Sequence, residues 1–150
     1  MTKQKSLLKN CIKGFLSLAV LGLFAVITSC NNDDDNTPAV THKIVYKAEA
    51  SAGTNITSAG YLDTPGGAVV FSQGVFGTTW VSPETIKTLG VPKGSTVKQS
   101  AYAQVKATGV NASSTLKVQI YVDGVLTKEV TGKGEDLKVE AREEVNFVTN

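Results

Sequence analysis

The stretch that decides the fold is LKVQIYVDGVLTKEV, which runs from Leu116 to Val130. Before its central pair, Leu116, Val118, Ile120 and Val122 occupy every second position, and this period of two is typical of a strand with one buried face. A second run, Val125 to Val130, follows the pair at once. The central pair is Asp123-Gly124, and such a link favours a type I′ hairpin, because both of its residues must adopt positive φ. The stretch therefore predicts two antiparallel strands joined by a tight turn.

The residues on either side of this hairpin continue the same alternation. A long strand is expected from Thr96 to Thr108, with Val97 and alternate small residues on one face. Pro83 to Leu89 is expected to form one helical turn with Ser82 as its cap. Turn-forming residues separate further strands, expected over residues 43–49, 55–62, 68–72, 78–82, 137–141 and 144–148. Seven or eight short strands predict an all-β, antiparallel immunoglobulin-like β-sandwich over residues 41–150.

Several of these segments together resemble a known family. They are a strand ending in small residues (45–50), the segment 55–61, an isolated Trp80, an Ala-rich strand (101–107) and the hairpin 118–129. Over residues 41–141 the chain is similar to the MmpS-type domain, a small immunoglobulin-like sandwich on membrane-tethered exported proteins. Members of the mycobacterial type hang from a transmembrane helix and assist large lipid or siderophore exporters. The resemblance implies the same fold and an accessory role in transport, although its most specific piece is also a generic hairpin.

The first 29 residues have the composition of a cleaved signal peptide. Lys3, Lys5, Lys9 and Lys13 make a basic start, and residues 14–27 carry no charge. As a helix, this apolar run would rise about 21 Å, short of the roughly 30 Å hydrocarbon core of a bilayer. A secretory signal is therefore favoured over a transmembrane anchor.

Ile27-Thr28-Ser29-Cys30 follows the apolar run and resembles the lipobox of bacterial lipoproteins. In that motif the thiol takes a diacylglycerol thioether, and the small residues before it give the signal peptidase access to the bond. An ordinary signal peptide that ends near a cysteine is the alternative. We expect Cys30 to be the lipidated first residue of the mature chain, anchored in the membrane by acyl chains. Since Cys11 lies in the removed segment, no thiol would remain for a disulfide or a metal site.

Residues 30–40 are expected to form a flexible tether, since the acidic run in it offers nothing to bury. Asp33, Asp34 and Asp35 also resemble the export signal of Bacteroidota lipoproteins displayed on the cell surface. Asn flanks them here, where that signal often has Lys or Gln. We therefore expect display on the cell surface. The periplasmic face of the outer membrane is the alternative. Calcium binding by the three acids is a weaker interpretation, since the spacing of an EF-hand is absent.

Charge and residue chemistry narrow the function. Four of the 15 basic residues precede Cys30, which leaves 11 against 13 acidic residues, a net charge of −2 for the mature chain. A nucleic-acid partner is therefore not expected. The one histidine, His42, is expected to be solvated at the edge of the tether, and one His supplies neither a triad nor a zinc site. The acidic residues of the domain fall in predicted turns or on solvated faces. We expect no catalysis, metal or cofactor.

The aromatic residues allow two interpretations. Trp80 and Phe71 are expected in the core, whereas Phe76 lies in a turn-like stretch where it could be exposed. Tyr61, Tyr102 and Tyr121 each alternate onto the polar face of a predicted strand. Tyrosines so placed either suit half-exposed strands or form a platform for a sugar or a protein. The sequence thus predicts a lipid-anchored, non-catalytic accessory module of an envelope complex; the alternative is a lipoprotein that binds a glycan or small ligand.

Overall fold

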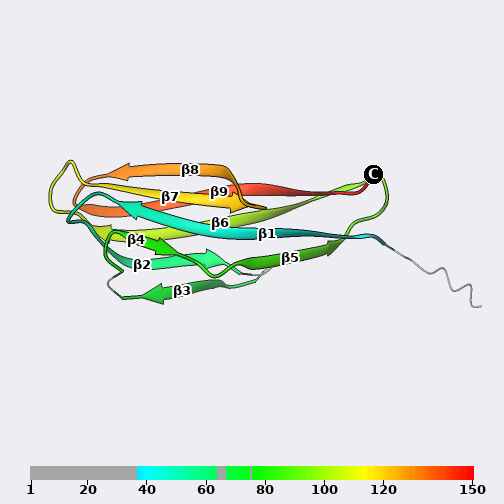
Figure 1. Ribbon diagram of the computed structural model, residues 1–150, viewed down its shortest axis with the longest axis horizontal. Coiled ribbons are helices and arrows are strands. Elements are labelled where there is room, and N and C mark those ends of the chain that lie inside the picture. The colour runs from blue at the N-terminus through cyan, green and yellow to red at the C-terminus, as the bar shows by residue number, and fades with distance from the viewer. Residues whose placement is uncertain (1–36, 64–66, 75) are drawn as a thin grey trace, which may run out of the picture. The chain divides into compact units, whose positions relative to one another are not determined.

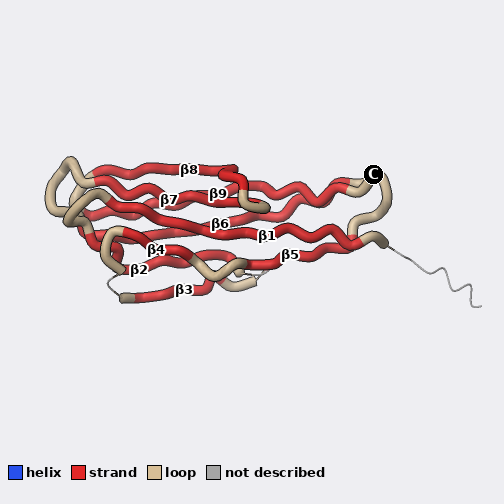
Figure 2. The backbone as a smooth tube through the Cα atoms, viewed as in Figure 1, coloured by secondary structure: helices blue, strands red, loops and turns tan. Residues whose placement is uncertain are grey.

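The computed structural model describes residues 37–63, 67–74 and 76–150. Every regular element in these residues is a strand (Figure 2). In chain order the strands are β1 (Ala39–Ala50), β2 (Asn55–Leu62), β3 (Val69–Gln73), β4 (Thr79–Val81), β5 (Thr85–Gly90), β6 (Thr96–Thr108), β7 (Thr115–Val122), β8 (Val125–Lys133) and β9 (Asp136–Val148).

The strands form two antiparallel sheets packed face to face (Figure 1). Sheet A has the order β4-β1-β7-β8, and β5 pairs with the first half of β1, beside β4. Sheet B has the order β3-β2-β6-β9. The start of β1, the link between β5 and β6 and the C-terminus lie at the same end (Figure 1). The antiparallel β-sandwich predicted from the sequence is confirmed.

The hairpin that predicted the fold joins β7 to β8. Asp123 and Gly124 have φ values of 51° and 81°, the left-handed conformation that a type I′ turn requires. From this turn Val122 pairs with Val125, and the register then shifts between Ile120 and Tyr121. The local signal was sufficient here because both turn residues tolerate positive φ.

The core lies between the inner faces of the two sheets. On β6 the inner face carries mainly alanines, Ala101, Ala103 and Ala107, all of them buried. Their small side chains leave room for large ones from the other strands, among which Tyr46 and Phe147 are fully buried. Small side chains on β6 are thus combined with large ones on other strands in one buried cluster.

The expected helical turn from Pro83 to Leu89 is wrong, since the structure has strand β5 there. Buried and exposed side chains alternate along Thr85–Leu89, and β5 pairs with residues 39–44 of β1. Ser82 does not cap a helix; its Oγ accepts a hydrogen bond from the N–H of Tyr46 at 3.0 Å. The capping signal is local, whereas pairing with β1 satisfies the backbone along the whole segment.

The two strands expected at the C-terminus are one continuous strand, β9. All 13 of its residues pair with β6, from Thr96 opposite Val148 to Thr108 opposite Asp136. The prediction left residues 142 and 143 between two strands, but β9 runs through them, with Arg142 and Glu144 on the outer face, where charges are solvated. Charge alone does not interrupt a strand if the alternation continues through it.

A β-bulge in β2 overturns two expectations about aromatic residues. The register between β2 and β6 shifts between Ile56 and Ser58. A one-residue shift moves every later side chain to the other face. Tyr61, expected on the polar face, is therefore in the core with 6% of its surface exposed. Gly60 points outward instead, and Phe71, which is opposite Gly60 and was expected in the core, is 54% exposed.

Candidate functional site

Cys30, Asp33, Asp34 and Asp35 lie outside the described residues, so their predicted roles stay predictions. In the part of the chain that the structure describes, no helix is long and apolar enough to cross a membrane. Over the same residues, no three side chains of the His, Cys, Asp or Glu type come together as a metal site.

His42 was expected to be solvated at the edge of the tether, but it lies in β1. Its Nδ1 lies 2.6 Å from Oδ2 of Asp123, and its Nε2 lies 3.2 Å from the carbonyl oxygen of Asn146. The ring also packs edge-on against Phe147, with centroids 4.7 Å apart. The backbone N–H of Lys43 donates to the same carboxylate at 2.8 Å. These bonds tie β1 to the β7–β8 turn and to β9, which is a structural role.

The hydrogen bonds to Asp123 have a measurable electrostatic consequence. The N–H of Lys43, and then His42, lower the pKa of the Asp123 carboxyl below its ordinary value. Both donors favour the charged carboxylate over the neutral acid. The contact between His42 and Asp123 thereby stabilises the packing of β1 against the β7–β8 turn. Both ring nitrogens of His42 face hydrogen-bond acceptors.

Two buried polar side chains of sheet A reach across to the backbone of sheet B where β2 ends. The hydroxyl of Tyr46 donates to the carbonyl oxygen of Leu62 at 3.1 Å, and Nζ of Lys87 donates to that of Ser100 at 3.1 Å. Burial raises the pKa of Tyr46 to about 12. Burial also lowers the pKa of Lys87, whose residue is only 1% exposed. These bonds give each buried side chain a partner on the opposite sheet. Both residues therefore hold the two sheets together.

The tyrosines do not form a shared platform. Tyr61 lies in the core, and Tyr102 and Tyr121 lie half-buried on the outer faces of sheets B and A, respectively. Trp80 is buried, as expected, and Phe76 packs partly buried against the core. A binding platform made of two tyrosines is therefore not present among the described residues.

The outer face of sheet A carries a group of apolar side chains, which we call the apolar patch: Val45, Val81, Ile86, Tyr121 and Leu126. The register places Val45, Tyr121 and Leu126 in one row across β1, β7 and β8. Val81 and Ile86 lie on either side of that row, opposite Lys47 and Lys43 of β1. The exposed fractions are 56% for Val81, 62% for Ile86 and 43% for Leu126. The patch therefore spans five strands.

Charged side chains border the apolar patch. Lys43 pairs with Glu84 at 3.1 Å, and Lys117 lies 3.8 Å from both Glu49 and Glu129. Nζ of Lys47 sits 4.5 Å from the centroid of the Tyr121 ring. The patch thus has an apolar centre and a rim in which acids and bases balance. Sequence reasoning missed it, because its members come from five strands and only the register brings them together.

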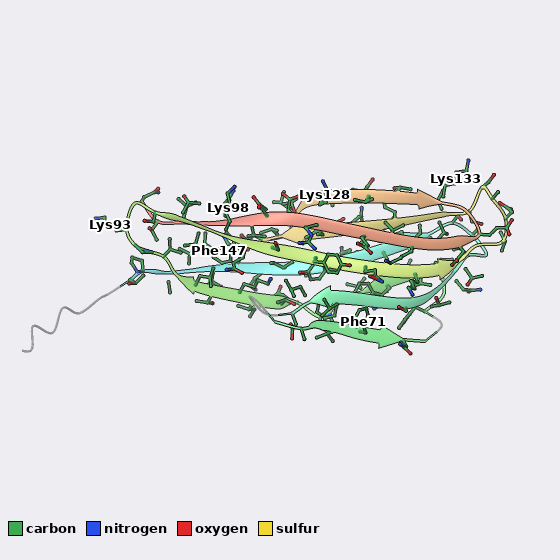
Figure 3. All side chains as sticks on the ribbon, turned by 180° about the vertical axis from the view of Figure 1, so that it is seen from behind. Phe71, Lys93, Lys98, Lys128, Lys133 and Phe147 are labelled. Atoms are coloured by element: carbon green, nitrogen blue, oxygen red, sulfur yellow. The ribbon has the colours of Figure 1, made fainter. Side chains whose placement is uncertain are left out.

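The outer face of sheet B is different in kind. Its long strands β6 and β9 present ion pairs, Lys98 with Glu144 at 3.0 Å and Lys138 with Glu140 at 2.7 Å. The exposed ring of Phe71 lies on the same side of the molecule (Figure 3).

No family model matches the chain, and no curated protein matches it either.

Proposed function

We propose that the chain is a lipid-anchored, non-catalytic interaction module of the bacterial envelope, which binds another envelope protein through the apolar patch. The observation that supports this most is that the register places five apolar side chains from five strands on one outer face, with Ile86 on β5 and Leu126 on β8 at its two sides. Isolated exposed apolar residues are ordinary on a protein surface, whereas a contiguous group with a polar border is typical of a protein interface.

The border of the patch fits the same function. In protein interfaces an apolar centre is excluded from water, and a polar rim around it sets orientation. Lys43, Glu84, Lys117 and Glu129 supply such a rim with both signs of charge. Such a balanced rim matches a partner with its own mixed charges better than it matches a polyanion.

The anchor is the second part of the proposal. Cys30 carries acyl chains and the residues up to 40 serve as a tether, which keeps the domain near the membrane and lets it reach a neighbour. Two or more acyl chains hold a protein stably, whereas one holds it marginally. Asp33 to Asp35 direct the protein to the cell surface; retention on the periplasmic face of the outer membrane is the alternative. The resemblance to MmpS-type domains suggests that the partner belongs to a transport complex.

Site-specific crosslinking tests the patch. A photoreactive amino acid is placed at Ile86 or, as a matched control, at Val110 in the turn between β6 and β7. The two residues are equally accessible, since Ile86 is 62% exposed and Val110 is 61% exposed. After irradiation of intact cells, we expect one discrete crosslinked product from position 86 and none of that size from position 110. Equal products from both positions, or none from either, would contradict the proposal.

Metabolic labelling tests the anchor. Cells that express the wild type or Cys30→Ala are grown with a palmitate analogue, and the protein is isolated and assayed for the label. We expect label on the wild type alone, together with a shift of the variant from the membrane to the soluble fraction. Equal labelling of both proteins would rule out lipidation at Cys30 and leave the patch to be judged by crosslinking.

A further inference from the structure

The outer face of sheet B holds one large apolar side chain in an unusual position. Phe71 lies directly opposite Gly60 in the β2–β3 ladder. A Cβ at position 60 would lie 2.4 Å from the Phe71 ring, so the ring occupies the space that a side chain of β2 would take. The ring is thus held over the sheet and keeps 54% of its surface exposed. The glycine is what allows this placement.

Side chains with planar hydrogen-bonding groups continue from Phe71 across the sheet. Gly60 pairs with Gln104, and Gln104 pairs with Glu140, so one row joins the ring, an amide and a carboxylate. The hydroxyl of Tyr102 donates to Oε1 of Gln104 at 3.2 Å, which orients the amide. The next pair on the same face of these strands is Tyr102 with Arg142. The guanidinium of Arg142 lies 5.2 Å from the centroid of the Tyr102 ring.

The carboxylate in this row is ionised and pairs with a base. Nζ of Lys138 donates to Glu140 at 2.7 Å and lowers the pKa of that carboxyl. Glu140 is therefore an acceptor for hydroxyl groups, while the amide of Gln104 and the guanidinium of Arg142 offer donors. The row from β3 to β9 crosses three strand spacings, about 14 Å, which is more than one sugar ring needs.

We infer that this row, Phe71, Gln104 and Glu140 with Arg142 beside it, binds an uncharged oligosaccharide. A pyranose ring has an apolar C–H face that packs on an aromatic ring, and its hydroxyls point outward to bond planar amide, carboxylate and guanidinium groups. The structure places these two kinds of group next to each other on one rigid sheet. The site is on the opposite face from the apolar patch, so the inference does not rest on the proposed function.

The charges on this face favour a neutral ligand over a polyanion or a protein. Lys98 and Lys138 are each paired with an acid, and Arg142 is stacked on Tyr102. Lys106 lies on this face as well, so four bases (Lys98, Lys106, Lys138 and Arg142) stand against three acids (Asp136, Glu140 and Glu144), a net charge of +1. A polyanion is favoured by a large excess of positive charge, which one net charge does not supply. A protein interface needs a sizeable apolar centre, whereas one exposed phenylalanine supplies little.

Affinity electrophoresis tests the inference. The full chain, in a detergent without a sugar headgroup, is run through native gels that contain starch, mixed-linkage β-glucan, galactomannan, xylan or polygalacturonate. We expect retardation by at least one of the four neutral polysaccharides. Phe71→Ala should weaken the binding by about tenfold, and Phe71→Trp should retain it. Gly60→Ala should weaken it as well, because the added methyl group displaces the ring.

The matched control is Val110→Ala, another exposed apolar residue, which should be retarded like the wild type. Thermal unfolding in solution verifies that each variant is folded before it enters the gel. The inference is overturned if no neutral polysaccharide retards the wild type, if only polygalacturonate does, or if folded Phe71→Ala is retarded as strongly as the wild type. Crosslinking through position 86 is unaffected by any of these outcomes.

Discussion

The two outer faces of the sandwich stand on the same core but present opposite chemistry. On sheet A the exposed residues between the charged borders are aliphatic, with Ile86 and Val81 more than half exposed. On sheet B the long strands pair acids with bases, and Phe71 is the largest exposed apolar side chain among the described residues of this face. The difference indicates that the faces suit different ligands, a protein for sheet A and a neutral saccharide for sheet B.

The contrast also shows how a small domain can present two different surfaces on one core. Each face takes its rigidity from side chains that cross between the sheets, such as Tyr46 and Lys87. Substitutions can therefore be sorted by whether they remove the common support or only one face. Substitutions in the shared core should cost the most stability, and substitutions on one exposed face should cost the least.

Phe147→Ala should have the largest effect, because it empties a fully buried site of the core beside His42. We expect a loss of about 3–5 kcal/mol in the free energy of unfolding. Urea denaturation measures it. Since the support is shared, crosslinking through sheet A and retardation by polysaccharide should decline together. If one activity survived in a protein that had lost the other, the faces would not depend on a single core.

Tyr46→Phe should cost about 1–2 kcal/mol, because the part-buried carbonyl of Leu62 loses its donor. The pKa of Tyr46 is raised from 10.0 to about 12 in the folded domain. The hydroxyl therefore contributes stability that is fully present below about pH 10 and is lost as pH rises toward 12.

Urea denaturation at several pH values from 8 to 12 checks this prediction. The difference between wild type and Tyr46→Phe should be constant up to pH 10 and should shrink above it. A difference that grows with pH would mean that the tyrosine is not held neutral by burial. Lys87 is present in both proteins, so its own titration cancels in the comparison.

Asp123→Asn should have a smaller effect on stability, since the carboxylate is half exposed and its contacts are screened by water. The pKa of Asp123 is depressed in the folded state, so its contribution is present above the ordinary value of 3.8 and is lost as pH falls through the lower folded value. We expect a lower Tm for the variant at pH 7 and equal Tm values near pH 2. A gap that persists at pH 2 would assign the effect to turn geometry.

Ile86→Lys should have the smallest effect on stability, within about 0.5 kcal/mol, because the side chain is 62% exposed. It should nevertheless abolish the crosslinked product in cells, with the photoreactive group placed at Val81, and leave binding of polysaccharide unchanged. Gel mobility and crosslinking on the same preparation measure both. Loss of both activities in a folded variant would show that the two faces are coupled.

Much of the fold could be predicted from residue order because its signals are local. The alternation on β6 and β7 and the Asp123-Gly124 turn require no knowledge of distant residues. The segment Thr85–Gly90 could not, since Pro83 and Ser82 carry a helix-start signal that pairing with β1 overrides. Tyr61 and Phe71 could not either, because one bulge between Ile56 and Ser58 reverses which side chains face the core.

The sequence by itself determined the class of the fold, the central hairpin and the expectation of a lipid anchor at Cys30, since each depends on neighbouring residues. Only the tertiary structure decided what the surfaces are. Ile86 and Leu126 lie far apart in the chain, and strand register places both on the outer face of sheet A, with Val45 and Tyr121 between their strands. Phe71 becomes a surface group because Gly60 lies opposite it. Register is set by the packing of all strands at once, and for that reason no single segment encodes it.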